Sequence, residues 1–230
     1  MQYKTANNRT RTKRKSRRRV KSLKRNRSRL KNASEYFDKR LEIRTSKYGN
    51  GIFATADIPK GTIVVREKPK MLESESGFLD FQSKYFALIE MLQRNHPAEF
   101  DNLVPTQEDQ NIMEFKKNNG DRIRQICLER NIPFDKGVIL FHKIKRNAFN
   151  FNNRTAILFF ATKFNHSCSP HLTYSPNGEY MEFTCLKDIR KGEEVFDSYI
   201  NYNMPYADRR ERLKRVYGFD CNCVMCSNQK

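Results

Sequence analysis

The chain has 230 residues, of which 37% are hydrophobic, and a formal net charge of +19 at pH 7. This length suits one large domain or two small ones. No stretch approaches the roughly 20 consecutive apolar residues of a membrane span. No apolar segment follows the N-terminal charges as it would in a secretory signal, so we expect a soluble intracellular protein.

The excess of positive charge belongs to the N-terminus. Residues 1–32 contain 15 Lys and Arg and no Asp or Glu, which leaves 30 basic and 26 acidic residues for the remainder. Because they have almost nothing apolar to bury, residues 1–34 are predicted to be a disordered basic arm. Through residues 4–31 the arm could contact nucleic acid, chromatin or an import receptor, which favours a nuclear location. The alternative is a solvated tail without a specific partner.

A first β unit is predicted after the arm. The segment "KYGNGIFATADIPKGTIVVREKPKML" indicates strand, turn and strand. Gly49 and Gly51 permit a tight backbone turn, and residues 59–61 mark a second turn before the β-branched run 62–65.

Residues 73–135 change character and are predicted to form a helical insert of about 60 residues. Segments such as "FLDFQSKYFALIEMLQRN" and "NIMEFKKNNGDRIRQICLERN" space their apolar residues three and four apart, as amphipathic helices do. The following "GVILFHKIKRNAF" indicates a further helix, although its continuous apolar run is a weaker pattern.

The chain then returns to strands. In "HLTYSPNGEYMEFTCLKDI" the alternation of residue types around Pro176-Asn177-Gly178 predicts a β-hairpin. "KGEEVFDSYINY" predicts another strand, and "YADRRERLKRVYGF" a compact helix after Pro205. The phrase "DIPKG" at residues 57–61 returns as "DIRKG" at 188–192, which indicates two similar β units on either side of the insert.

The six cysteines indicate a metal site rather than disulfides. Cys221, Cys223 and Cys226 form a C-x-C-x-x-C run, a spacing that suits a metal in a reducing compartment. A tetrahedral zinc site needs a fourth ligand. Cys127 and Cys185 lie in apolar stretches and are predicted to be core residues. By chemistry alone, the fourth ligand could be Cys168, His166 or His171.

Four phrases together resemble the SET-domain protein-lysine methyltransferases: "YGNGIFAT", "FNHSCSP", "KGEEVFDSYIN" and "CNCVMC". The similarity is closest to the SET-and-MYND branch and its fungal relatives, and it covers residues 40–72 and 140–227. The chain departs from that branch in two ways. It has no cysteine-rich MYND finger, and it has His171 where the family usually has Asn.

The resemblance implies an α+β fold in which short strands and small sheets form a β-clip with a knot-like C-terminal segment. It places a SET domain at residues 35–218, with the helical insert at about 73–140, and a post-SET zinc-binding segment at 219–230. It also implies that Cys168 completes a structural zinc site with Cys221, Cys223 and Cys226.

The implied activity is transfer of a methyl group from S-adenosylmethionine to a lysine of a histone or another protein. The matching positions give catalytic Tyr199 and Tyr217, a substrate channel of Phe149, Tyr199 and Tyr217, and cofactor contacts from Gly49, Asn50, Gly51, Asn147, Asn165, His166, Tyr199 and Phe219. The alternatives are a catalytically silent SET-like scaffold and a chromatin- or nucleic-acid-binding protein that acts through the basic arm.

Overall fold

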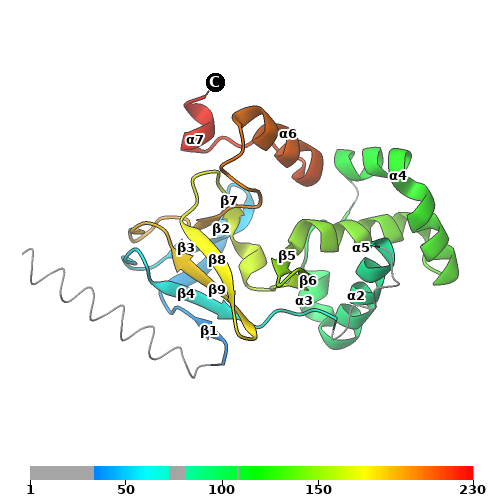
Figure 1. Ribbon diagram of the computed structural model, residues 1–230, viewed down its shortest axis with the longest axis horizontal. Helices are drawn as coiled ribbons and strands as arrows, with labels where there is room; N and C mark the ends of the chain where they lie inside the picture. Colours follow the sequence, from blue (N-terminus) through cyan, green and yellow to red (C-terminus); the bar gives the residue numbers. More distant parts are fainter. Residues whose placement is uncertain (1–33, 73–80, 108, 230) are drawn as a thin grey trace, which may run out of the picture.

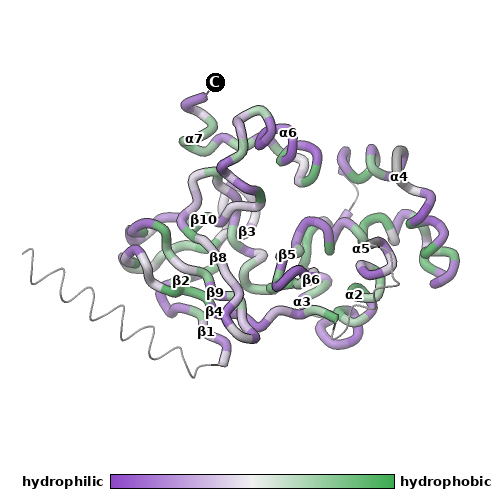
Figure 2. The backbone as a smooth tube through the Cα atoms, in the orientation of Figure 1, coloured by the Kyte–Doolittle hydropathy of each residue, from purple (hydrophilic) through white to green (hydrophobic). Residues whose placement is uncertain are grey.

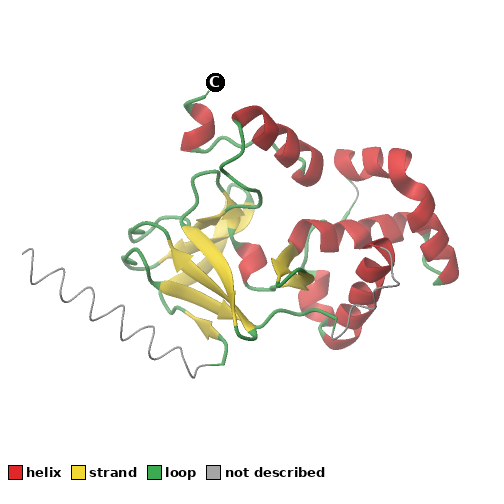
Figure 3. Ribbon diagram, viewed as in Figure 1, coloured by secondary structure: helices red, strands yellow, loops and turns green. Residues whose placement is uncertain are grey.

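The computed structural model describes residues 34–72, 81–107 and 109–229 (Figure 1). The predicted basic arm, apart from its last residue, and the first residues of the predicted insert lie outside these ranges. Most strands lie on one side of the molecule and helices α2 to α5 on the other, with β5 and β6 next to the helices (Figure 3). Helices α6 and α7 lie together at the C-terminal end.

The strands form several small sheets instead of one large one. A four-stranded antiparallel sheet has the order β1-β4-β9-β8, and three two-stranded sheets pair β2 with β3, β5 with β6 and β7 with β10. The strands are β1 Tyr36–Phe37, β2 Leu41–Ser46, β3 Gly49–Ala54, β4 Ile63–Glu67, β5 Ala148–Phe151, β6 Arg154–Ile157, β7 Asn165–His166, β8 Leu172–Asn177, β9 Tyr180–Cys185 and β10 Phe196–Asp197. This arrangement confirms the predicted α+β class.

The two similar phrases of the sequence pair with each other. Ile58 and Ile189 exchange both backbone hydrogen bonds, at 2.8 and 2.9 Å. The Asp188 carboxylate accepts from the N–H of Lys60 at 2.6 Å. In the equivalent contact, the Asp57 carboxylate accepts from the N–H of Lys191 at 2.9 Å.

The turn glycines extend this equivalence. Gly61 donates to Cys185 O at 2.8 Å, and Gly192 donates to Ala54 O at 2.7 Å. Both glycines have positive φ, +79° and +88°, a conformation that few other residues adopt without strain. The two β units are therefore joined by equivalent hydrogen bonds in both directions. The turn of each unit bonds to the backbone of the other.

Hydrophobic segments are distributed over both the strands and the helices (Figure 2), and two large apolar cores lie among the described residues. One lies between the sheets and includes Ile52, Val65 and Phe183. The other lies among the helices and includes Phe86, Ile126 and Phe141. Cys185 belongs to the first core and Cys127 to the second, as their apolar neighbours predicted.

The predicted helical insert is confirmed among the described residues. Its helices are α2 Phe81–Asn95, α3 Pro97–Asp101, α4 Gln110–Glu129 and α5 Phe134–Asn147. Prolines precede or open α3 and α5, and the Asp109 carboxylate caps α4 by accepting from Ile112 N at 3.0 Å. The weaker helical pattern is thus a true helix, and it continues to Asn147. None of the helices formed by the described residues combines the length and the hydropathy of a membrane span.

The C-terminal part consists of short helices. They are the 3₁₀ turn η1 Ala161–Lys163, α6 Tyr206–Tyr217 and α7 Val224–Ser227. Helix α6 begins after Pro205 and ends at Gly218, whose φ of +82° and bonds to Leu213 O and Lys214 O close the last turn.

Two sequence predictions differ from the structure in detail. Asn177 pairs with Tyr180, so the hairpin turn is Gly178-Glu179 and is not centred on Asn177. Gly178, with φ of +61°, stands at the first turn position, where a type II′ turn requires glycine.

The strand predicted for "KGEEVFDSYINY" is reduced to β10. Its backbone N–H groups are distributed among different partners: Phe196 N donates to His171 Nδ1 and Tyr199 N to His166 Nδ1, each at 3.1 Å. Because side chains accept these bonds, a long ladder with one neighbouring strand does not form.

Candidate functional site

A pocket of about 360 Å³ is bounded by the β units, the insert and the C-terminal segment. Residues from all three parts line it, and many of them are aromatic. Among the lining residues are Tyr48, Val104, Arg146, Asn147, Phe149, Asn165, His166, Tyr174, Asp197, Tyr199, Tyr217, Phe219 and Asn222. Seven of the residues predicted for the cofactor site and the substrate channel therefore meet in one place, together with the predicted metal ligand Cys221.

Tyr199 is held rigidly in the pocket wall. Its hydroxyl donates to Phe164 O at 2.8 Å, and its backbone N–H donates to His166 Nδ1. Burial, and then the charge of Asp197, raise the pKa of the Tyr199 phenol well above its usual value. The group is consequently a neutral hydrogen-bonding phenol at neutral pH.

Tyr217 faces Tyr199 from the last residue of α6. The two ring centroids lie 5.0 Å apart, and the Tyr217 hydroxyl donates to Tyr199 O at 3.2 Å. Burial is the main cause that raises the pKa of Tyr217 to about 12. Phe219 continues the same wall, with its centroid 6.4 Å from that of Tyr217 and 5.8 Å from the ring of His166.

Asn165 joins the predicted Gly-x-Gly segment to the pocket. Its side-chain amide donates to Asn50 O at 3.0 Å and to the Glu194 carboxylate at 2.7 Å. A side chain at Gly51 would meet the side-chain ends of Asn165 and Glu194, so glycine leaves room for the hydrogen bond between them. Gly49 has φ of +98°. Residues 49–51 do not themselves line the pocket; they lie behind Asn165, which does.

His166 connects the tyrosine wall to the cysteines. Its Nδ1 accepts from Tyr199 N, which leaves the proton on Nε2, 3.4 Å from Cys168 Sγ. Burial lowers the pKa of His166 to about 4, so the ring is neutral. Both ring nitrogens therefore have partners within the protein, and a ligand would meet the main chain or the face of this residue.

The remaining predicted residues, Asn147 and Phe149, come from the junction of α5 and β5. The Asn147 amide donates to Val104 O at 2.5 Å and to Lys143 O at 2.8 Å, which ties the end of α5 to the loop after α3. The Phe149 ring contacts Tyr174 and Phe183 edge to face. Asn147 is thus a fixed part of the wall, whereas Phe149 extends the aromatic surface between pocket and core.

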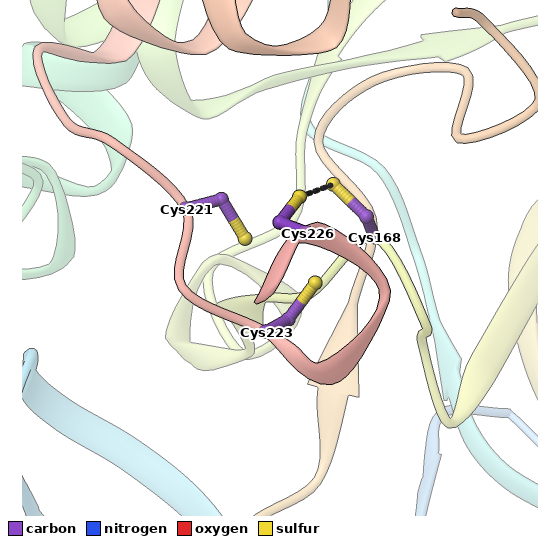
Figure 4. Close-up of side chains that lie close together, drawn as sticks. All are labelled: Cys168, Cys221, Cys223 and Cys226. Atoms are coloured by element: carbon purple, nitrogen blue, oxygen red, sulfur yellow. Dashed lines mark hydrogen bonds between the residues drawn. The ribbon is translucent and has the colours of Figure 1, made fainter. Parts of the chain in front are cut away.

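The four predicted cysteine ligands form one cluster (Figure 4). Their sulfur atoms all lie within 4.8 Å of one another, and Cys168 Sγ is 3.5 Å from Cys226 Sγ. His166 and His171, the rival ligands by chemistry, are not members of the cluster. His171 accepts instead from Phe196 N.

The chemistry of this cluster fits a zinc ion. Tetrahedral coordination with Zn–S bonds of about 2.3 Å places sulfurs about 3.8 Å apart, close to the observed spacing. Burial raises the pKa of Cys168, and it is the main cause that raises the pKa of Cys221 to about 11. A cation is therefore needed to hold these buried sulfurs as thiolates.

Arg209, which sequence reasoning missed, supplies a charge beside the cluster. It is 4% exposed, and its guanidinium donates to Met204 O at 2.6 Å and to the Gln229 side chain at 2.9 Å. Burial acts to lower its pKa, but hydrogen bonds to Cys226 and Cys168 raise it on balance. Within the predicted α6 the sequence shows several arginines, and nothing in their spacing distinguishes the buried one.

Two polar contacts of the insert near the pocket were also not predicted, one within the insert and one between the insert and α6. The Arg146 guanidinium binds the Asp109 carboxylate at 2.6 and 3.1 Å. The Asn111 amide donates to Lys214 O and, at 3.2 Å, to Arg215 O, close to the end of α6. The helix that carries Tyr217 is therefore capped by the insert.

Fold and site together define an α+β protein with two exchanged β units, an aromatic pocket and a C-terminal four-cysteine cluster. The SET domain family profile matches residues 49–200, and the chain belongs to this family. The predicted family is confirmed.

The relatives agree with this assignment. A SET domain-containing protein of Acanthamoeba polyphaga mimivirus is 33% identical over 197 residues, which is 80% of this chain and 76% of the viral protein. Human N-lysine methyltransferase SMYD2 is 34% identical over 101 residues, 41% of this chain but 23% of SMYD2. These matches place the chain near the SET-and-MYND branch.

A solved structure shows the same fold. The SET domain of LSMT bound to lysine and AdoHcy superposes with a TM-score of 0.60 at 16% identity, over 88% of this chain and 58% of the LSMT chain. The chain thus spans only part of the named methyltransferases.

Proposed function

We propose that this chain is a protein-lysine N-methyltransferase that uses S-adenosylmethionine, with a lysine of a histone or another protein as the methyl acceptor. The observation that carries the proposal is the pairing of Tyr199 and Tyr217 across a pocket whose floor includes Asn165 and His166. Membership of the SET family and similarity to N-lysine methyltransferase SMYD2 support it.

The pocket suits the chemistry of amine methylation. Methyl transfer is an in-line displacement, and alignment of the reacting groups can supply about 7–11 kcal/mol. S-adenosylmethionine, when bound, supplies the methyl group from its sulfonium. Tyr199, Tyr217 and Phe149 would form a channel that orients the lysine amine, and their aromatic faces would tolerate the methylammonium product.

The cofactor contacts belong to the proposal as well. Asn147, Asn165, His166, Tyr199 and Phe219 line the pocket, and residues 49–51 support Asn165 from behind. The Phe219 ring would cover the adenine. The main chain of residues 165–166 would bond to its polar edge, because both ring nitrogens of His166 are already engaged.

We assign a structural role to a zinc ion held by Cys168, Cys221, Cys223 and Cys226. Four thiolates leave no coordination position for water. The ion would cross-link the segment after β7 to the end of the chain, and so hold Tyr217 and Phe219 over the pocket. In this proposal residues 35–218 are the SET domain and residues 219–230 its zinc-binding extension.

The experiment is incubation of the zinc-loaded chain and labelled S-adenosylmethionine with histones and with a cell lysate, followed by mass spectrometry. We expect the label on lysine, and a loss of about 100-fold or more in Tyr199→Phe, because that phenol orients the reacting amine. Tyr180→Phe, in the remote hairpin, is the control and should retain activity. Label on arginine or on nucleic acid, or no label at all, would contradict the proposal.

The alternatives are tested by cofactor binding. A silent scaffold would not bind S-adenosylhomocysteine, whereas the enzyme should. Contact of the basic arm with chromatin or nucleic acid, and a nuclear location, stay predictions; residues 1–33 lie outside the described part of the chain.

A further inference from the structure

The pocket contains a buried carboxylate that the proposed roles do not use. Asp197 lines the pocket, two residues before Tyr199, and is 3% exposed. Its carboxylate accepts a hydrogen bond from the backbone N–H of Ser198. Within the described ranges, no lysine, arginine or histidine forms an ion pair with it.

The neighbouring groups do not neutralise this carboxylate. The charge of Asp197 contributes, after burial, to the raised pKa of Tyr174 and Tyr199, so it lies within electrostatic reach of the pocket's phenols. The Tyr199 hydroxyl nevertheless donates to Phe164 O. The arginine of the same pocket, Arg146, binds Asp109 on the insert.

Such an arrangement favours a cation as ligand. A buried carboxylate is costly unless it is paired, because burial removes its hydration. Burial raises the pKa of Asp197 to about 7, although the Ser198 N–H opposes the shift. A positively charged group that enters the aromatic pocket would restore the missing partner, and the aromatic faces of Tyr174 and Tyr217 would add to its stabilisation.

We propose that Asp197 binds the ε-ammonium of the substrate lysine and accepts a proton from it before methyl transfer. This inference rests on the proposed function. In the step, an N–H bond of the ammonium breaks and an O–H bond forms on Asp197. The lone pair left on the lysine nitrogen becomes the nucleophile. After the product leaves, the proton passes from Asp197 to solvent.

Because of the electrostatics of the pocket, this proton transfer should determine how kcat/KM depends on pH. The titratable and charged groups that line the pocket with Asp197 are Tyr199 on its own segment, Tyr174 on β8, Tyr217 on α6, His166 on β7, Arg146 on α5 and Asp220 after α6. Glu194 acts on the Tyr199 phenol from the same segment. The phenols have raised pKa values, and that of Tyr217 is about 12. His166, with a pKa of about 4, is neutral. Within the pocket wall, Asp197 is therefore the group expected to titrate near pH 7.

The first test measures binding without turnover. Nα-acetyl-lysine amide and its neutral counterpart Nα-acetyl-norleucine amide are titrated into the zinc-loaded full chain at pH 8, with ligand-observed NMR as the readout. We expect the lysine probe to bind about tenfold or more tightly than the norleucine probe, because it alone makes a charge-assisted hydrogen bond. Asp197→Asn should bring this ratio close to one, because only the cation–π contribution of the aromatic rings then remains.

Asp220→Asn is the matched control, since it removes another carboxylate that lines the pocket. Asp220 is exposed and already paired with Arg210 at 3.4 Å and Lys214 at 3.3 Å, so the lysine preference should persist. A melting curve confirms that each variant is folded, and Asp197→Thr serves as a second neutral substitution. The inference is overturned if the unsubstituted chain binds both probes equally well. It is also overturned if neither Asp197 substitution changes the affinity ratio of the two probes.

The second test is the pH dependence of kcat/KM for methyl transfer. With Asp197 as base, the rate should rise to a plateau above pH 7. In Asp197→Asn, kcat/KM should continue to rise toward the lysine pKa of about 10.4. At pH 8 it should be about 100-fold lower than in the unsubstituted chain. Glu67→Gln, which alters a carboxyl outside the pocket with a pKa also near 7, should leave the inflection in place. An inflection that persists in Asp197→Asn overturns the base assignment.

The two tests separate this inference from the proposed function. If no protein substrate is methylated, the proposed function fails, while the probe-binding ratio still decides whether Asp197 is a cation site. If methylation occurs but the ratio does not depend on Asp197, the function stands and the inference fails.

Discussion

The two walls of the pocket come from regions that are stabilised in different ways. The wall with Asn165, Asp197 and Tyr199 stands on the β units, whose core of large apolar side chains is closed by reciprocal turns. The wall with Tyr217 and Phe219 belongs to a small C-terminal cluster with five buried residues, Cys168, Ile200, Leu213, Cys221 and Cys226. Three of the five are cysteines, so apolar burial alone cannot hold this wall in place. With the proposed zinc ion, the position of the second wall would depend on the metal, whereas that of the first would not.

Loss of the metal should have the largest effect, because it should disorder the C-terminal wall and leave the wall on the β units intact. In Cys223→Ala we expect zinc content to fall from one per chain toward zero and methyl transfer to be abolished, since structural zinc contributes on the order of 10 kcal/mol. Hydrogen exchange should rise in residues 217–229 and stay unchanged in strands β4 and β9. Full activity in a variant shown to lack zinc would contradict the dependence of the second wall on the metal.

Substitution of Arg209 should have a smaller effect on the same C-terminal wall. Four thiolates with one zinc ion carry a net negative charge, and the buried guanidinium lies against two of them. Arg209→Met should weaken zinc binding about 10- to 100-fold, measured by competition with a chelator. Arg209→Lys should restore part of it. Arg210→Met, at the exposed neighbouring position, should bind zinc normally; equal losses at both positions would exclude a specific role for Arg209.

On the rigid side, Glu67 should give the β units a pH-dependent stability. Its carboxylate accepts from Phe160 N at 2.9 Å and Ala161 N at 3.0 Å, and burial raises its pKa to about 7. The folded protein therefore binds this proton more tightly than the unfolded chain. Its contribution is complete below about pH 4.5 and is lost as the pH rises through 7.

We expect this loss to be on the order of 2 kcal/mol, measured by urea unfolding between pH 5 and 8. Glu67→Gln should flatten that slope. The pKa of Asp197 is also raised, so Asp197→Asn should remove a separate part of the pH dependence of stability. A slope in both variants that equals the slope of the unsubstituted chain would show that neither group is responsible.

The smallest expected effect concerns the reciprocal turns. Asp57→Ala and Asp188→Ala each remove one carboxylate that accepts a backbone N–H, and each should cost about 1 kcal/mol of unfolding free energy. Because the two contacts are equivalent, the two losses should be similar. A large difference between them would show that the exchanged turns are not energetically equivalent.

The sequence predicted those features that depend on local pattern or on a family motif. The helices of the insert followed from the spacing of apolar residues, the cysteine cluster from the C-x-C-x-x-C run together with Cys168, and the pairing of Tyr199 and Tyr217 from the SET resemblance. The roles of residues whose neighbours come from distant segments of the chain were not predicted. Asp197 is an ordinary acidic residue until Tyr174 and Tyr217 fold around it. Asn111 acquires its role only where α4 meets α6.

The exchange of turns between the β units also bears on how the polypeptide could be divided. A backbone cut between α3 and α4 would separate the two units, yet each would still hold the hydrogen-bonding partners that the other lacks. Neither fragment alone would be expected to fold. Co-expressed, the two should reassemble without a covalent link, so this domain lends itself to fragment complementation.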